Sequence, residues 1–183
     1  RRPATPADPA TLPRLANGRP DFTGIWNAGI KDLVGLMDLQ LEVPLTPDYA
    51  AVRAKRVKAI EDGTPLPDFV STCQAFGMPR IMSYGTFEFV ARPEQLWMVT
   101  EVLHEVRRIY LDGRYHGKFQ EPGFDGVSTA HWEGDTLVVE TRNLRAGYMN
   151  MTGIPHSDRM TVIERLRMVN PNALENEMTI IDP

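Results

Sequence analysis

Residues 127–143 read VSTAHWEGDTLVVETRN, and this stretch decides the fold class. Both of its halves are rich in β-branched and aromatic residues, which favour strands. Glu133-Gly134-Asp135 lies between the two halves, and a short polar turn containing glycine between such runs is typical of a β-hairpin. The stretch therefore predicts two antiparallel strands, Val127–Glu133 and Thr136–Asn143.

The same pattern recurs on both sides of this hairpin. Asn170-Pro171-Asn172 is a second turn signal between two strand patterns. Further strands are predicted over Tyr84–Ala91, Gln95–Glu101, Glu105–Asp112, Met160–Asn170, Ala173–Asp182 and, near the start, Phe22–Ala28. Seven or eight short strands of this kind predict a mainly β fold, an antiparallel β-barrel-like (lipocalin- or calycin-like) domain or a strongly curved sheet.

One helix is predicted near residues 47–62. Thr46 is a suitable N-cap and Pro47 suits the first helical position. The basic residues of this helix, Arg53, Lys55, Arg56 and Lys58, are expected on a solvated face. Residues 1–20 contain five prolines and few large apolar side chains, so they predict a surface arm that precedes a single β-rich domain over residues 21–183.

Composition excludes several classes of protein. A chain of 183 residues with 42% hydrophobic residues suits one folded domain, and a formal charge of −4 argues against nucleic-acid binding. No apolar run approaches the about 18 residues that a membrane span needs. The lone cysteine, Cys73, cannot close an internal disulfide and is expected to be a buried, inert thiol. The expected partner is a small molecule, with neither nucleic acid nor membrane, and a homo-oligomer is left open.

Glu164 is the polar exception on an apolar strand face. Alternate residues of a strand share a face, so Met160, Val162, Leu166 and Met168 lie on the same side as Glu164. A carboxylate that faces a core loses hydration unless a cation or several donors meet it, and such a group is a candidate general acid or base. The alternative is a buried ion pair between Glu164 and an arginine that ties neighbouring strands together.

The strand Glu105–Asp112 supplies the expected partners of Glu164. Arg107 and Arg108 lie on opposite faces, and either could point inward, where a guanidinium fits a carboxylate or an anionic substrate. His104 is expected at the rim of the sheet, where histidine suits proton transfer. We therefore predict Glu164 as the acid/base, with His104 or His116 as its partner and Arg108 as the group that stabilises a developing oxyanion.

Further residues are predicted to contact a substrate, namely Tyr110, Arg107, Tyr148, His131 and His156. Tyr148 lies in a predicted loop that could close over a pocket. Three histidines can form a zinc or copper site, but no two histidines here have a short ligand spacing, and most are interpreted as capping or hydrogen-bonding loop residues. No Walker loop and no G-x-G-x-x-G turn is present, so we predict neither a cofactor nor a defined metal site.

Several segments together resemble a family of uncharacterised, often secreted proteins of soil and sphingomonad-type bacteria. They are residues 17–26 (NGRPDFTGIW), 106–116 (VRRIYLDGRYH) and 132–141 (WEGDTLVVET), followed by Pro155-His156-Ser157 and Glu164-Arg165. The resemblance spans residues 17–183; its matching polar positions are Glu101, His104, Arg107, Arg108, Tyr110, Asp112, His116, His156 and Glu164. One departure is Val127, where such sequences often have a histidine, while His131 is additional.

The resemblance implies export to the periplasm or the extracellular space, and it implies no particular activity. The chain starts at Arg1 rather than at methionine, and a removed secretion signal is one explanation. It ends directly after a predicted strand, so the question of whether a further strand closes a barrel is left open.

We therefore predict an exported enzyme that uses cofactor-independent acid/base chemistry, as an isomerase, lyase or hydrolase, on an apolar or aromatic substrate in a barrel pocket. One alternative is a non-catalytic protein that holds a small ligand, and another is a histidine-ligated metal enzyme. Full pairing of Glu164 with arginine away from any cavity would argue against acid/base chemistry at Glu164. A deep apolar pocket without a titratable group would favour simple binding.

Overall fold

A computed structural model of the chain describes residues 4–27, 42–68, 70–83, 85–118, 120–150 and 152–183. The predicted central hairpin is present as β5 (Val127–Glu133) and β6 (Thr136–Arg142). Gly134 joins the two strands with a φ of +60°, a left-handed conformation that glycine adopts without steric cost. The hairpin that decides the fold class is therefore confirmed.

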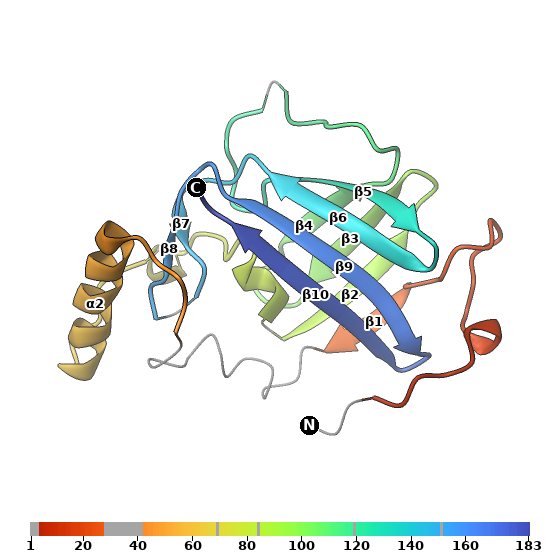
Figure 1. Cartoon of the computed structure of the whole chain (residues 1–183), viewed down its shortest axis with the longest axis horizontal. Helices are drawn as coiled ribbons and strands as arrows, with labels where there is room; N and C mark the ends of the chain where they lie inside the picture. The colour runs from red at the N-terminus through yellow and green to blue at the C-terminus, as the bar shows by residue number, and fades with distance from the viewer. Residues whose placement is uncertain (1–3, 28–41, 69, 84, 119, 151) are drawn as a thin grey trace.

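Eight strands form one curled sheet, a half-barrel in the order β1-β2-β3-β4-β5-β6-β9-β10 (Figure 1). Besides β5 and β6 they are β1 (Gly24–Asn27), β2 (Thr86–Ala91), β3 (Gln95–Thr100), β4 (Val106–Tyr110), β9 (Thr161–Asn170) and β10 (Ala173–Ile181). β1 and β10 are the edge strands, and no strand pairing joins them within the described residues. The mainly β prediction is confirmed in this form.

One pair of strands departs from the antiparallel prediction. β4 and β5 run parallel, with Ile109 opposite Ser128 and Tyr110 opposite Thr129. The connection between them spans residues 111–126, and a parallel pair needs such a long connection because the chain must return to the same edge of the sheet. The remaining neighbours are antiparallel.

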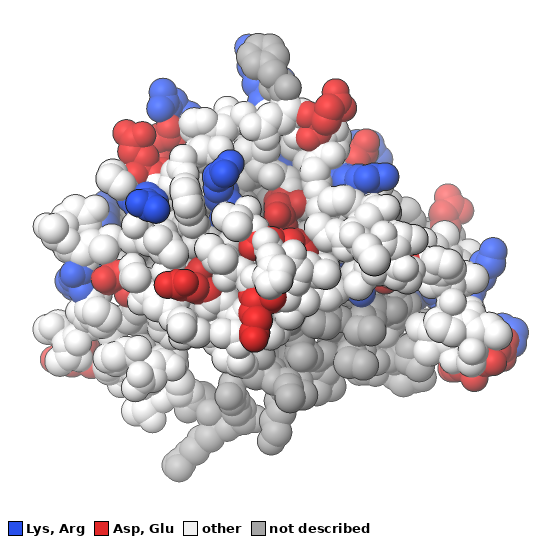
Figure 2. Space-filling model, turned by 180° about the vertical axis from the view of Figure 1, so that it is seen from behind, with Lys and Arg blue, Asp and Glu red and all other residues white. Residues whose placement is uncertain are grey.

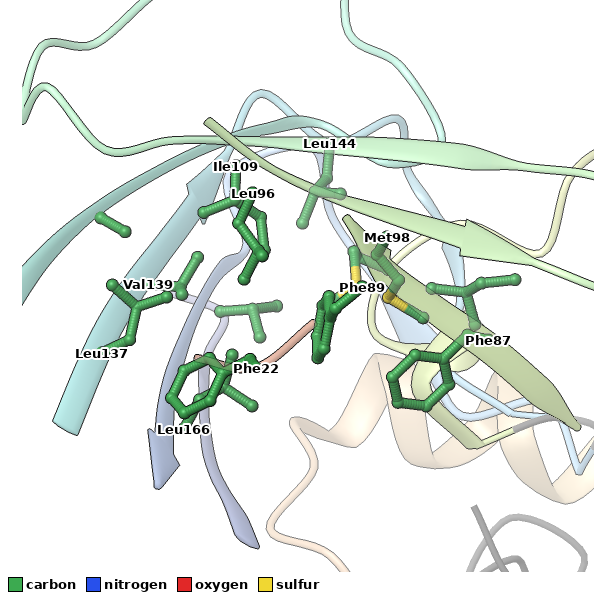
Figure 3. Packing of buried hydrophobic residues seen from close by; sticks show 14 of the residues in the cluster. Phe22, Phe87, Phe89, Leu96, Met98, Ile109, Leu137, Val139, Leu144 and Leu166 are labelled. Carbon is green, nitrogen blue, oxygen red and sulfur yellow. The ribbon is translucent and has the colours of Figure 1, made fainter. Parts of the chain in front are cut away.

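The core fills the concave side of the curl. Phe89, Met98, Ile109, Leu137 and Leu166 are almost completely buried there, and they come from five different strands (Figure 3). Each strand contributes alternate residues to this face, as the period of two in the burial pattern of β9 illustrates. The inside of the half-barrel is therefore a packed core.

The helix α2 (Pro47–Glu61) lies outside the sheet, beside the short hairpin of β7 (Gly147–Tyr148) and β8 (Pro155–His156) (Figure 1). The backbone N–H of Tyr49 donates to the Thr46 hydroxyl at 3.4 Å, so the predicted N-cap is confirmed. The expectation of a fully solvated basic face is wrong at Arg56, which is buried.

Arg56 is buried because it connects α2 to two neighbouring segments. Its guanidinium lies over the ring of Tyr148, 4.1 Å from the ring centroid. It also donates to the carbonyl oxygens of Leu66 and Pro67. The methylene chain of Arg56 packs where Gly153 leaves room, since a Cβ at Gly153 would lie 2.3 Å from Cδ of Arg56.

Residues 4–20 run beside the hairpin ends of the sheet, as the red segment of Figure 1 shows. The backbone N–H of Ala7 donates to the carbonyl of Val169, and Arg14 forms an ion pair with Asp135 at 2.7 Å. Pro20 is buried and Leu12 packs against the core. The proline-rich arm thus adheres to the sheet through specific contacts.

Two surface features complete the fold. Cys73 is exposed, which corrects the expectation of a buried thiol, and its φ of +59° places it in a turn. Figure 2 shows acidic and basic side chains scattered among uncharged ones, so this face presents no broad area of one sign. In the described part of the chain, no helix has both the length and the apolar character needed to span a membrane.

Candidate functional site

A buried ion pair between Arg107 and Glu164 lies inside the half-barrel. Arg107 on β4 is 2% exposed and Glu164 on β9 is 0% exposed. Nη1 of Arg107 donates to Oε1 of Glu164 at 3.2 Å, and Nη2 donates to Oε2. This two-point contact uses the planar geometry of both groups and joins β4 to β9, with β5 and β6 lying between them in the sheet.

Neighbouring polar side chains complete the hydrogen bonding of this pair. Arg107 donates from Nε to Ser128 Oγ at 3.0 Å and from Nη2 to Thr141 Oγ1 at 2.9 Å. Glu164 also accepts a bond of 3.0 Å from Nδ2 of Asn176. We call these five residues the Arg107–Glu164 cluster. Its geometry is that of the structural ion pair given above as the alternative for Glu164.

Two further carboxyl groups, Glu105 and Asp125, meet where β4 and β5 begin. Parallel strands begin at the same edge of a sheet, which brings together residues 20 positions apart in the chain. Glu105 accepts the backbone N–H groups of Phe76 at 2.6 Å and Gly77 at 3.2 Å. Burial and then the charge of Glu105 raise the pKa of Asp125 to about 6, while Arg107 acts in the opposite direction.

The Glu105–Asp125 pair was not predicted from the sequence. Nothing in either segment indicates that the two carboxyls meet, because their contact depends on the parallel pairing of β4 with β5. The pair holds the 76–77 segment against the sheet through the two hydrogen bonds of Glu105. Gly77 suits this position, since a Cβ there would lie only 2.3 Å from the carbonyl oxygen of Phe124.

A pocket of about 770 Å³ lies between the start of α2, residues 149, 150, 154 and 155, and the end of β10. Its apolar wall includes Val43, Met149, Ile154, Met178, Ile180 and Ile181. Several separate parts of the chain therefore contribute to it, and none of these residues was predicted from the sequence as part of a site. Met178 faces Glu164 across the β9–β10 ladder, but Glu164 does not itself line the pocket.

Polar groups occupy one side of this pocket. Asp182 accepts hydrogen bonds from the backbone N–H of Ser157, at 2.8 Å, and from the Ser157 hydroxyl. Tyr49 lies next to them, and burial together with the charge of Asp182 raises the pKa of the Tyr49 phenol. Arg159 also lines the pocket and donates to the carbonyl of Pro183 at 3.3 Å.

The structure separates Arg108 and His104 from Glu164. Arg108 is exposed on the outer face of β4, with its guanidinium 5.6 Å from the ring centroid of Trp97. His104 is exposed in the turn before β4, at a φ of +52°. Arg107 is the inward arginine because it shares a face with the buried Ile109. No contact between described residues joins Arg108 or His104 to Glu164.

His116 pairs with a different carboxylate. Its Nε2 lies 3.0 Å from both oxygens of Asp112, and its ring stacks on Tyr110 at a centroid distance of 3.9 Å. The bond from His116, followed by one from the Arg114 backbone, holds the pKa of Asp112 well below its usual range. Tyr110 and His116 thus form a half-buried surface contact on the outer side of β4.

The other predicted substrate contacts are dispersed. His131 is exposed and lies 3.2 Å from Glu133. His156 is buried, and burial lowers its pKa while its Nδ1 donates to the Ser157 carbonyl at 3.1 Å. Tyr148 is half-buried under Arg56. Within the described ranges, no group of three or more His, Cys, Asp or Glu side chains is arranged to hold a metal ion.

Comparisons with known proteins add no relative. No family model, no curated protein and no solved structure matches the chain. The resemblance to secreted bacterial proteins therefore stays a prediction. The features that bear on function are the pocket, the Arg107–Glu164 cluster and the Glu105–Asp125 pair.

Proposed function

We propose that the protein binds a small, predominantly apolar molecule in the pocket between α2 and the end of β10. One observation carries the proposal: a pocket of about 770 Å³ combines an apolar wall with a few polar groups on one side. Small-molecule sites are typically concave, largely apolar and supplied with a few orienting polar groups. This function corresponds to the non-catalytic alternative of the sequence analysis.

The contacts of Glu164 support binding over acid/base chemistry at that residue. Both carboxylate oxygens accept bonds from Arg107, and Asn176 adds a third donor. Glu164 is 0% exposed and lies outside the pocket lining, so a bound molecule in the pocket does not contact it. A carboxylate held in this way is suited to tying strands together.

An enzyme that acts on the same ligand is the second candidate, and Tyr49 is the observation that favours it. Its phenol lines the pocket next to Ser157 and Asp182, and burial with the charge of Asp182 raises its pKa, which favours the neutral phenol. A protonated phenol can donate a hydrogen bond or a proton to a ligand oxygen. In this candidate Tyr49 replaces Glu164 as the acid.

Two finer predictions accompany the proposal. A lipocalin- or calycin-like architecture is supported by the antiparallel run of β1 to β4, whereas the parallel β4–β5 pair departs from it. Export to the periplasm or the extracellular space is supported by the sequence resemblance alone.

Binding is tested with N-phenyl-1-naphthylamine, an apolar dye whose fluorescence rises in a dry pocket. We expect saturable binding at one site per chain. Ile180→Arg places a charge on the pocket wall at a position that is already 41% exposed, so we expect at least a tenfold loss of dye affinity with little effect on folding.

Thr179→Arg is the matched control. Thr179 is the neighbouring exposed residue on the opposite face of β10, and it does not line the pocket. We expect this variant to bind the dye as the unmodified protein does. No saturable binding by the unmodified protein, or equal losses in the two variants, would contradict the proposal.

A further inference from the structure

One lining residue of the pocket, Asn150, carries a polar group that the described protein leaves unused. Asn150 is 2% exposed and opens the turn between β7 and β8. The turn is closed by a bond of 2.8 Å from the Met149 N–H to the Ile154 carbonyl. Asn150 is therefore held in place by backbone contacts on one side, and it is one of the residues that line the pocket.

The orientation of the Asn150 amide follows from its partners. Oδ1 accepts the backbone N–H of Ile154 at 3.0 Å and the hydroxyl of Thr152 at 3.1 Å. A backbone N–H can only donate, so the atom that meets Ile154 must be the amide oxygen and not the amide nitrogen. Nδ2 is consequently the end of the amide that the turn does not use.

Nδ2 of Asn150 is buried and has no hydrogen-bond partner among the described residues. A buried donor without an acceptor is unfavourable, and most buried polar groups in folded proteins are paired. An acceptor atom supplied by a bound molecule would satisfy this donor. The same pocket offers the apolar surface for the rest of that molecule.

The charges around the pocket favour a neutral acceptor. Among the described residues of the lining, Asp48 and Asp182 are carboxylates and Arg159 supplies the one guanidinium. An anionic ligand would meet this excess of negative charge, whereas a ketone, ester or amide oxygen carries no net charge.

We propose that the pocket takes a neutral, predominantly apolar carbonyl compound, whose oxygen accepts a hydrogen bond from Nδ2 of Asn150. This inference rests on the proposed function, because it names the class of ligand for the same pocket. It assigns Asn150 as the residue that distinguishes a carbonyl compound from a hydrocarbon of the same size.

The test compares 2-undecanone with undecane as competitors of the bound naphthylamine dye. The variant Asn150→Asp, studied at pH 8, keeps the oxygen that Ile154 and Thr152 use and replaces the nitrogen donor by a second oxygen. We expect the affinity for 2-undecanone to fall about tenfold relative to that for undecane. Thr152→Val changes only the turn side of the amide and should leave the ratio of the two affinities unchanged.

A second measurement needs no variant. The carbonyl stretching frequency of 2-undecanone labelled with ¹³C at the carbonyl should be lower in the complex than in a hydrocarbon solvent, because a hydrogen bond weakens the C=O bond. A frequency equal to that in hydrocarbon, or an unchanged affinity ratio in Asn150→Asp, would overturn the assignment of Asn150. In both cases dye binding by the unmodified protein would still support the pocket, whereas its failure would contradict the proposed function itself.

Discussion

Replacing Glu164 by glutamine should destabilise the protein strongly, because it removes the carboxylate to which the buried Arg107 guanidinium is directly hydrogen-bonded. The two side chains are 0% and 2% exposed, so water cannot substitute for the lost charge. Removing one partner of a buried ion pair costs about 3–5 kcal/mol. We expect the lower end of this range, since glutamine retains an oxygen for the 3.0 Å bond from Asn176.

This loss is a large part of the about 5–15 kcal/mol by which a domain is usually stable. It corresponds to a decrease in Tm of about 2–4 °C for each kcal/mol in a chain of this size. The matched control is Glu175→Gln. Glu175 on β10 also pairs with an arginine, Arg167 on β9, but both of those side chains are 51% exposed. An exposed pair of this kind contributes about 0–1 kcal/mol.

The assay is equilibrium unfolding in urea, followed by the fluorescence of the three tryptophans. Salt provides a second criterion, since buried pairs are screened much less than exposed ones. The effect of Glu164→Gln should persist in about 1 M NaCl, whereas any effect of Glu175→Gln should shrink. The double variant Arg107→Met/Glu164→Leu should be more stable than Glu164→Leu alone, because it leaves no unpaired charge.

Equal stabilities of Glu164→Gln and Glu175→Gln would refute this reasoning. The reasoning would also be refuted if the stability lost in Arg107→Met/Glu164→Leu equalled the sum of the stabilities lost in Arg107→Met and in Glu164→Leu. Side chains in direct contact are expected to be coupled, so these losses should not add.

Two further predictions concern the segment at the start of β4 and β5. The pKa of Asp125 is raised to about 6, so its contribution to stability is complete below its unfolded pKa of 3.8 and is lost as the pH rises through about 6. Urea titrations measure the free energy of unfolding of Asp125→Asn minus that of the unmodified protein. This difference should rise by about 1–3 kcal/mol between pH 4 and pH 7. A difference that does not change with pH would contradict the raised pKa. Gly77→Ala and Gly134→Ala both place a side chain at positive φ, but only at Gly77 does the new Cβ meet backbone, 2.3 Å from the Phe124 oxygen. Thermal unfolding should show a loss of about 1–2 kcal/mol for Gly134→Ala and a clearly larger one for Gly77→Ala; equal losses would mean that the close contact is relieved without cost.

Strand and helix positions could be predicted because the signals act over a few residues. β5 was predicted with its observed bounds, and the N-cap at Thr46 with Pro47 correctly located the start of α2. Alternating apolar residues also placed Glu164 on the core face of β9. Each of these features depends on neighbours that are close in the chain.

The sequence pattern of β4 does not decide whether Arg107 or Arg108 points into the core. Both alternate faces of β4 carry an apolar residue and an arginine, so the pattern alone could not say which arginine points inward. The orientation follows from the packing of Ile109 in the core and from the partners that Ser128 and Thr141 offer on β5 and β6. A shift of one residue in register would have exchanged the two.

The sequence by itself therefore determined a mainly β protein with one capped helix and an apolar strand face interrupted by Glu164. The tertiary structure alone decided that Arg107 neutralises Glu164, that Glu105 meets Asp125, and that a pocket forms beside Asn150. The physical reason is distance along the chain. Strand periodicity and helix capping act between near neighbours, whereas ion pairs and pockets join segments whose meeting depends on how the whole sheet is paired.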